Sequence, residues 1–143
     1  MNNTTLDEVK DKFFSLITAG EVLPDALVDE WLDSAIGEYE LELHQKLDIV
    51  EEIVPEMIDD ELQYVVIKKF TSRLSSAQKS LLGRYMQREF ITRELSRWSK
   101  VTGIDSKDER VSGLQATKIT LRAELEKAET AIAELVFKLK ELS

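Results

Sequence analysis

The chain has 143 residues, 43% hydrophobic and 33% charged side chains and a net charge of −9, which suit a single self-supporting domain and exclude disorder over the whole length. Because it contains no cysteine, disulfides, thiolate nucleophiles and zinc–thiolate sites are excluded as well. No apolar run approaches the ~18 residues of a membrane span and the N-terminus lacks a signal-peptide layout, so we expect a protein made and assembled in cytoplasm with no membrane partner.

A first helix is expected over residues 5–18. Thr5 and Glu8 have the spacing of a capping box, and Gly20 is a suitable C-terminal cap. The apolar residues between them recur at helical spacing. A second helix is expected from Pro24, a first-turn proline followed by an acidic residue. Its apolar face comprises Leu27, Val28, Trp31, Leu32, Ala35, Ile36, Tyr39 and Leu43, opposite an acidic face.

Residues 43–57 fit a helix extension or a short strand before Pro55, and we favour an irregular connection. A third helix is expected over 58–74, entered through Asp59 and Asp60, although its Val-Val-Ile run is typical of a strand. A fourth helix is expected over 77–99, capped by Ser75 or Ser76.

A polar loop is expected over 101–113, followed by a long helix over 114–142. Nine residues of that helix follow alternating steps of four and three, and eight of them are apolar, which indicates a heptad seam. They are Leu114, Lys118, Leu121, Leu125, Ala128, Ile132, Leu135, Leu139 and Leu142. The seam either packs along its own bundle or projects to dock onto another protein. Together these elements predict an all-α fold, a bundle of four to five helices with a long C-terminal helix, in one domain over 1–143.

Charge is distributed unevenly along the chain. Residues 1–67 carry a net charge of −15, residues 68–100 carry +7 and residues 101–143 carry −1. The basic block either pairs with acidic surface in the same or a neighbouring subunit, contacts nucleic-acid backbone, or is a solvated face. The arginines Arg84, Arg88, Arg93 and Arg97 are the residues on which a nucleic-acid-binding or packaging-accessory role would depend.

No motif for catalysis or metal binding is found in the sequence. His44 is the single histidine and has neither a thiol nor a second histidine to act with. The acidic run over 48–61 lacks the order of a calcium loop, and phosphate-loop, glycine-fingerprint and nucleophile-elbow patterns are missing. We therefore expect a protein that is no enzyme and holds no cofactor and no metal.

Two stretches resemble a known family. The first is Leu23–Val28 with Trp31-Leu32, Ala35-Ile36 and Tyr39-Glu40, and the second is Arg93–Lys100 with Gly103-Ile104, Lys107-Asp108, Ser112–Leu114 and Ala116–Lys118. In these residues the chain is similar to the head-tail connector proteins, also called adaptor, neck or head-completion proteins, of long-tailed bacteriophages.

The resemblance implies a structural virion protein of the phage neck. Such proteins form a ring, commonly of twelve subunits, that binds the portal protein and the next neck or tail-completion protein and lines the channel through which DNA passes without sequence-specific binding. Charges split between two halves of a chain suit the head-to-tail contacts of a ring. The candidate interface residues are Arg84, Arg88, Arg93, Arg97, Lys107, Asp108, Leu135, Val136, Phe137 and Leu139.

Overall fold

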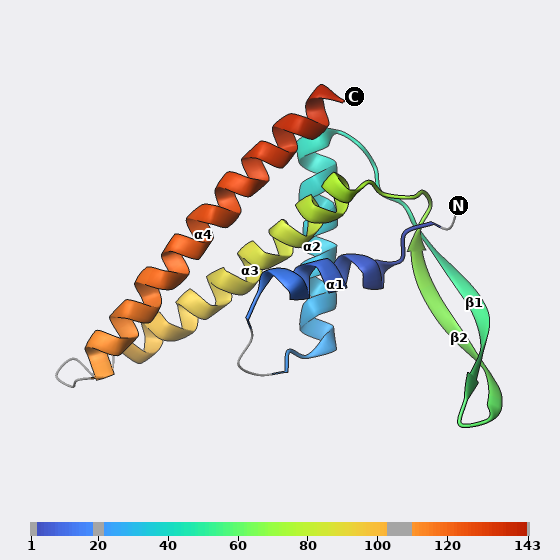
Figure 1. Ribbon diagram of the computed structural model, residues 1–143, viewed down its shortest axis with the longest axis horizontal. Coiled ribbons are helices and arrows are strands. Elements are labelled where there is room, and N and C mark those ends of the chain that lie inside the picture. The colour runs from blue at the N-terminus through green and yellow to red at the C-terminus, as the bar shows by residue number, and fades with distance from the viewer. Residues whose placement is uncertain (1–2, 19–21, 103–109, 143) are drawn as a thin grey trace.

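The computed structural model describes residues 3–18, 22–102 and 110–142 (Figure 1). In this part of the chain the elements are α1 (Leu6–Leu16), α2 (Asp25–Leu43), β1 (Ile49–Ile58), β2 (Glu61–Phe70), α3 (Ser76–Thr102) and α4 (Arg110–Glu141). Strands β1 and β2 form a two-stranded antiparallel sheet, so the expected all-α fold is wrong and the fold is mixed. Figure 1 shows the helices gathered in one body and the β1–β2 hairpin, called the arm below, projecting from it.

The arm replaces two elements that were wrongly predicted. The irregular connection expected over 43–57 is mostly strand β1, and the third helix expected over 58–74 is mostly strand β2. Asp59 and Asp60 join the strands with φ angles of 51° and 64°, and two successive positive φ angles are typical of a tight two-residue hairpin loop. Both strands carry apolar residues on both faces, so the alternation that identifies a strand is absent from the sequence.

Two capping boxes begin helices at the positions where the sequence predicted them. The Glu8 carboxylate accepts a hydrogen bond from the Thr5 backbone N–H at 2.8 Å, and the Thr5 hydroxyl accepts one from the Glu8 N–H at 3.2 Å. Ser75 and Gln78 form the same reciprocal pair at α3, at 2.7 and 3.1 Å. Each box satisfies two backbone donors that have no partner within the helix.

The core lies where α1, α2 and α3 meet. All the apolar residues predicted for the face of α2 are buried there except Leu27, which is partly buried. The rings of Phe13, Trp31 and Phe90, one from each helix, contact one another edge-on with centroids 5.7–6.3 Å apart. Helix α1 approaches α3 closely at Gly83, where a side-chain Cβ would lie 3.1 Å from Cγ of Lys12.

Helices α3 and α4 pack side by side as the two longest elements (Figure 1). The loop expected over 101–113 is shorter than predicted, because α3 continues to Thr102 and α4 begins at Arg110; residues 103–109 lie outside the described residues. Ala128 and Ile132 of the heptad seam are buried, and Leu121, Leu125, Leu135 and Leu139 pack partly buried against the core. The middle of the seam therefore packs along its own bundle. None of the described helices is long and apolar enough to cross a membrane.

The base of the arm is fixed to the body by the N-terminal segment. The buried Thr4 accepts a hydrogen bond from the Phe70 N–H through its backbone carbonyl, at 2.8 Å, and one from the Leu74 N–H through its hydroxyl, also at 2.8 Å. An ion pair between Arg73 and Glu8 lies beside these bonds. Phe70 itself is buried at the end of β2. The arm is therefore rigidly attached at its base, and its outer part extends beyond the body.

Candidate interaction surfaces

One face of the outer half of the arm is apolar. Cross-strand partners in an antiparallel pair share a face, and here the pairs Ile53–Val66, Pro55–Tyr64 and Met57–Leu62 follow one another toward the tip. We call these six residues the outer arm face. Ile53, Met57, Leu62, Tyr64 and Val66 are 58–70% exposed. Soluble chains rarely expose a contiguous apolar strip of this kind unless a partner covers it.

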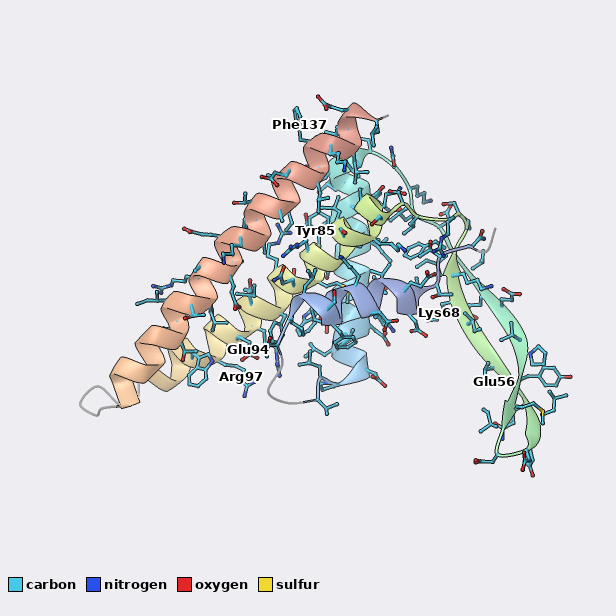
Figure 2. All side chains as sticks on the ribbon, in the orientation of Figure 1. Glu56, Lys68, Tyr85, Glu94, Arg97 and Phe137 are labelled. Carbon is cyan, nitrogen blue, oxygen red and sulfur yellow. The ribbon has the colours of Figure 1, made fainter. Side chains whose placement is uncertain are left out.

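The tip of the arm is acidic. Residues 53–66 contain Glu56, Asp59, Asp60 and Glu61 and no basic residue. Figure 2 shows Glu56 on the arm, well away from the helices. On the opposite face of the hairpin, Val54, Ile58, Val65 and Ile67 are half-buried, and Lys69 forms an ion pair with Glu52. The exposed apolar residues of the outer half are thus concentrated on one face, beside a cluster of carboxylates.

A groove with basic walls lies between α1, α3 and α4. It has a volume of about 370 Å³, and its apolar lining residues are Leu16, Ala131 and Leu135. Lys12, Arg84 and Lys138 line it, with Glu134 as the one carboxylate among the lining residues. None of these three basic side chains forms an ion pair with a carboxylate in the described part of the chain. We call this site the basic groove.

A larger cleft of about 620 Å³ lies between the end of α1, the second half of α3 and the beginning of α4. Its walls include Leu16, Phe90 and Trp98, together with Glu94 and Arg97. Glu94 binds both Arg93 and Arg97 at 3.3 Å, and Figure 2 shows Glu94 and Arg97 close together on α3. Of the charged groups that line this cleft, Glu94 and Arg97 are engaged with each other.

The predicted interface arginines lie in different environments along α3. Arg84 lines the basic groove and donates a hydrogen bond to Gln87 at 2.9 Å. Arg88 lies 5.2 Å from the centre of the Tyr85 ring and 3.7 Å from the Glu38 carboxylate. Arg93 and Arg97 share Glu94. Among the described residues, Arg84 is thus the one of the four that forms no ion pair with an acidic side chain.

The remaining predicted interface residues divide into three groups. Leu135, Val136 and Leu139 pack partly buried against the core, and Leu135 also reaches the basic groove beside Arg84. Phe137 is 66% exposed and lies near the end of α4 (Figure 2). Lys107 and Asp108 lie outside the described residues. The structure thus brings Arg84 and Leu135 together in one groove, and none of the other described interface candidates is among its lining residues.

Part of the basic block pairs with the acidic half of the same chain. Lys69 binds Glu52, Arg73 binds Glu8 and Arg88 contacts Glu38. These contacts agree with one of the alternatives that the charge distribution left open, pairing within the subunit. These ion pairs involve three of the nine basic residues in the block, and Arg84, which lines the basic groove, is not one of them.

Three ionisable groups have pKa values displaced by the fold. Burial raises the pKa of Tyr85 to about 12, helped by the carboxylates of Glu42 and Glu38, and its hydroxyl is buried without a hydrogen-bond partner. Burial also raises the pKa of Tyr39, against the effect of its hydrogen bond from Gln78. The Thr5 backbone N–H lowers the pKa of Glu8, and the nearby Arg73 lowers it further.

Each of these shifts is accounted for by burial, hydrogen bonds and neighbouring charges. His44, the single histidine, is exposed at the end of α2, where it has a positive φ of 55°. In the described residues no group of three or more histidine, aspartate or glutamate side chains is arranged to hold a metal ion.

Two surfaces that stand out in the structure were not predicted from the sequence. The outer arm face was hidden by the assignment of 58–74 to a helix. Lys12 and Lys138 of the basic groove are far apart in the sequence and come together only through packing of α1 and α4 on α3. A sequence signal for the arm did exist in the Val-Val-Ile run, whose β-branched residues favour strands.

Comparison with protein-family models, curated proteins and solved structures gave no match. The function of the chain is therefore inferred from its own surfaces and from the residues quoted above for the connector resemblance.

Proposed function

We propose that the chain is a structural subunit of the neck of a long-tailed bacteriophage. In this role its copies form a ring that joins the portal protein to the next neck or tail-completion protein and surrounds the DNA channel. The subunit acts by binding other macromolecules and not by catalysis, and it is assembled in the host cytoplasm. Subunits of such a ring need surfaces that bind identical neighbours at different sites.

The observation that supports this role most strongly is the arm. Strands β1 and β2 have ten residues each, and the outer arm face is exposed to solvent over its whole length. An isolated two-stranded hairpin is marginally stable in water, so a partner that covers its apolar face would stabilise it. In a structural assembly such partners remain bound, so an exposed apolar arm can serve there as a binding surface.

The charge of the molecule is also consistent with a DNA channel. The chain carries a net charge of −9, and a ring of such subunits repels the phosphate backbone, so that DNA slides without sticking. Arg88, Arg93 and Arg97, on which the nucleic-acid-binding alternative depended, are engaged with glutamates. Their contribution to phosphate binding is reduced by these contacts, which favours the structural role.

Coexpression with the portal protein encoded by the same genome tests the proposal. A tagged portal is expected to retain the chain, and electron microscopy is expected to show a ring of additional density on the portal. A monomeric chain in isolation is compatible with this result, because connector subunits can assemble on the portal. Failure to bind the portal, or a gene that does not lie between capsid and tail genes, would refute the proposal.

Binding to duplex DNA is the discriminating measurement for the alternative role. A nucleic-acid-binding protein that uses Arg84, Arg88, Arg93 and Arg97 is expected to bind DNA with an affinity that falls steeply with salt concentration. The structural proposal predicts little DNA binding by the isolated chain even at low salt. An Arg84→Gln variant controls for the one arginine of the four that has no acidic partner.

A further inference from the structure

We propose that the tip of the arm docks into the basic groove of a second copy of this chain. This inference rests on the proposed function only in assuming that the copies form a ring. It adds the two surfaces through which neighbouring subunits bind. The occupant of the groove is the segment 53–66, and the receptor is the groove between α1, α3 and α4.

The charges of the two surfaces are complementary. The segment 53–66 carries four carboxylates and no basic residue, whereas the groove presents Lys12, Arg84 and Lys138 against Glu134. In a chain with 28 acidic residues, three basic side chains that converge on one groove without a carboxylate partner indicate an anionic ligand. The acidic tip of the arm supplies carboxylates of the required sign.

The apolar parts of the two surfaces also correspond. Met57 and Leu62 form the pair of the outer arm face nearest the tip, next to the acidic loop residues Asp59 and Asp60, whereas Glu56 and Glu61 lie on the opposite face of the hairpin. The groove likewise combines apolar lining residues, among them Leu135, with basic ones. Protein interfaces combine apolar and charged groups in this way. A phosphate backbone has no apolar group to place against those apolar residues, so the arm is the better occupant.

The arm and the groove of one molecule do not meet. Figure 1 shows the arm extending away from the helical body, whereas α1, α3 and α4 enclose the groove within that body. A second copy is therefore required to bring them together. Because the two surfaces are different and lie apart, the contact is head-to-tail, and such contacts close into rings or continue as filaments.

Pairing between two arms is the other way to cover the outer arm face with a second copy. Two arms placed side by side through their outer arm faces, with their tips together, would bring the two tip loops, each with Asp59 and Asp60, close to one another. Like charges placed opposite each other destabilise strand pairs. The groove avoids this repulsion, which is why we assign the arm to it.

The absence of cysteine from the sequence makes disulfide trapping a clean test. Leu62→Cys places a thiol on the exposed tip of the arm, and Ser80→Cys places one in the groove with a change of a single atom. Ser96→Cys is the matched control, since the exposed Ser96 is on the same helix about 24 Å further along at 1.5 Å per residue.

Full-length chains carrying Leu62→Cys and Ser80→Cys are mixed at millimolar concentration under mild oxidation, and mixed dimers are counted by mass spectrometry. The expected rate is at least about tenfold higher than for the mixture of Leu62→Cys with Ser96→Cys. Equal rates for the two mixtures, or no cross-link in either, would overturn the proposal. Dominant Leu62–Leu62 dimers would overturn it in favour of pairing between arms.

A single chain with both Leu62→Cys and Ser80→Cys reports the symmetry of the contact. Head-to-tail docking is expected to give a ladder of dimers, trimers and larger species, whereas products that stop at the dimer contradict it. Charge reversal adds a further test. Arg84→Glu and Glu61→Lys are each expected to slow the Leu62–Ser80 cross-link about tenfold, and their combination across the interface is expected to restore most of the rate. Failure of the combination to restore it counts against the pairing.

The outcomes separate this inference from the proposed function. A chain that binds the portal but shows no preference between Ser80→Cys and Ser96→Cys retains the neck role and loses the arm–groove contact. A chain that gives the expected cross-links but ignores the portal retains the contact and loses the phage role. Salt-dependent binding of duplex DNA that is abolished by Arg84→Glu, with unchanged cross-linking rates, would assign the groove to phosphate instead.

Discussion

The helical body and the arm differ in how their apolar side chains are used. In the body, Phe13 is completely buried against Trp31 and Phe90, whereas Tyr64 on the arm is 70% exposed. The body is therefore stabilised by contacts within one chain. The outer arm face packs against no core among the described residues, so a partner that covers it would stabilise the arm. Substitutions in the two regions should affect unfolding and association separately.

The largest expected effect is in the body. Phe13→Ala removes a ring from the contact between α1, α2 and α3, and the free energy of unfolding is expected to fall by about 3–5 kcal/mol. The neighbouring Phe14, which is 46% exposed, is the matched control, and Phe14→Ala is expected to cost about 1 kcal/mol or less. Chemical denaturation measures both. If Tyr64→Ala on the arm destabilised the monomer as much as Phe13→Ala, the arm would have to belong to the cooperative core.

The junction between the two regions comes next. Thr4→Ala leaves the Leu74 N–H without its buried hydrogen-bond acceptor, and the cost is expected to be about 1–3 kcal/mol. Hydrogen exchange at the Phe70 amide, which is bonded to the Thr4 carbonyl, should become faster as the base of the arm loosens. Thr4→Ser retains the hydroxyl and is expected to retain most of the protection. If Thr4→Ala and Thr4→Ser lost the same amount of hydrogen-exchange protection, the methyl group and not the hydrogen bond would stabilise the junction.

Tyr85→Phe is expected to stabilise the body. The Tyr85 hydroxyl is buried without a hydrogen-bond partner among the described residues, and its removal is expected to raise the free energy of unfolding by about 1 kcal/mol. The pKa of Tyr85 is about 12 in the folded chain and its ordinary value is 10.0. The free energy of unfolding is therefore unaffected by this ionisation below pH 10, and it falls between pH 10 and 12 because the unfolded chain releases the proton first. The variant should show a shallower loss of stability over that interval. Unchanged alkaline behaviour would contradict the assignment.

Glu8 is expected to have a smaller effect at acid pH. Its folded pKa lies below the ordinary value of 4.5 because of the Thr5 N–H and Arg73, so its contribution is present above pH 4.5 and is lost as the pH falls below it. Glu8→Gln retains the capping-box geometry and loses the charge. The free energy of unfolding is therefore expected to fall by about 0.5 kcal/mol at neutral pH. The difference in free energy of unfolding between the unsubstituted chain and Glu8→Gln should vanish as the pH decreases. A difference that persists in acid would exclude the carboxylate charge as its origin.

The smallest expected effect is at the tip of the arm. Asp60 has a φ of 64°, a conformation that glycine adopts at no steric cost, so Asp60→Gly is expected to stabilise the hairpin locally by about 0.5 kcal/mol. Slower hydrogen exchange of the outer strand amides, with unchanged global unfolding, is the expected result. A change in global unfolding of the same size would show that the tip is coupled to the body.

The features predicted correctly depend on short-range patterns. The Thr5–Glu8 capping box and the cap at Ser75, one of the two serines expected there, follow from hydrogen bonds between residues three positions apart. The apolar face of α2 and the middle of the α4 seam follow from helical periodicity within one segment. The arm was predicted wrongly because Leu62, Val65, Val66 and Phe70 imitate helical spacing. In a hairpin with apolar side chains on both faces, no periodicity distinguishes a strand from a helix.

The candidate site was predicted only in part, for a related reason. Arg84 and Leu135 were singled out separately, one from a basic block and one from a heptad seam, and the groove joins them with Lys12 and Lys138 from two other positions in the chain. Sequence alone determined the capped starts of α1 and α3, the apolar face of α2, the middle of the α4 seam and the separation of charge, since these depend on neighbours along the chain. Tertiary structure decided which residues of 49–70 pair across the hairpin and which basic side chains line one groove without forming an ion pair among the described residues. Both depend on contacts between segments that the backbone brings together only when the chain is folded.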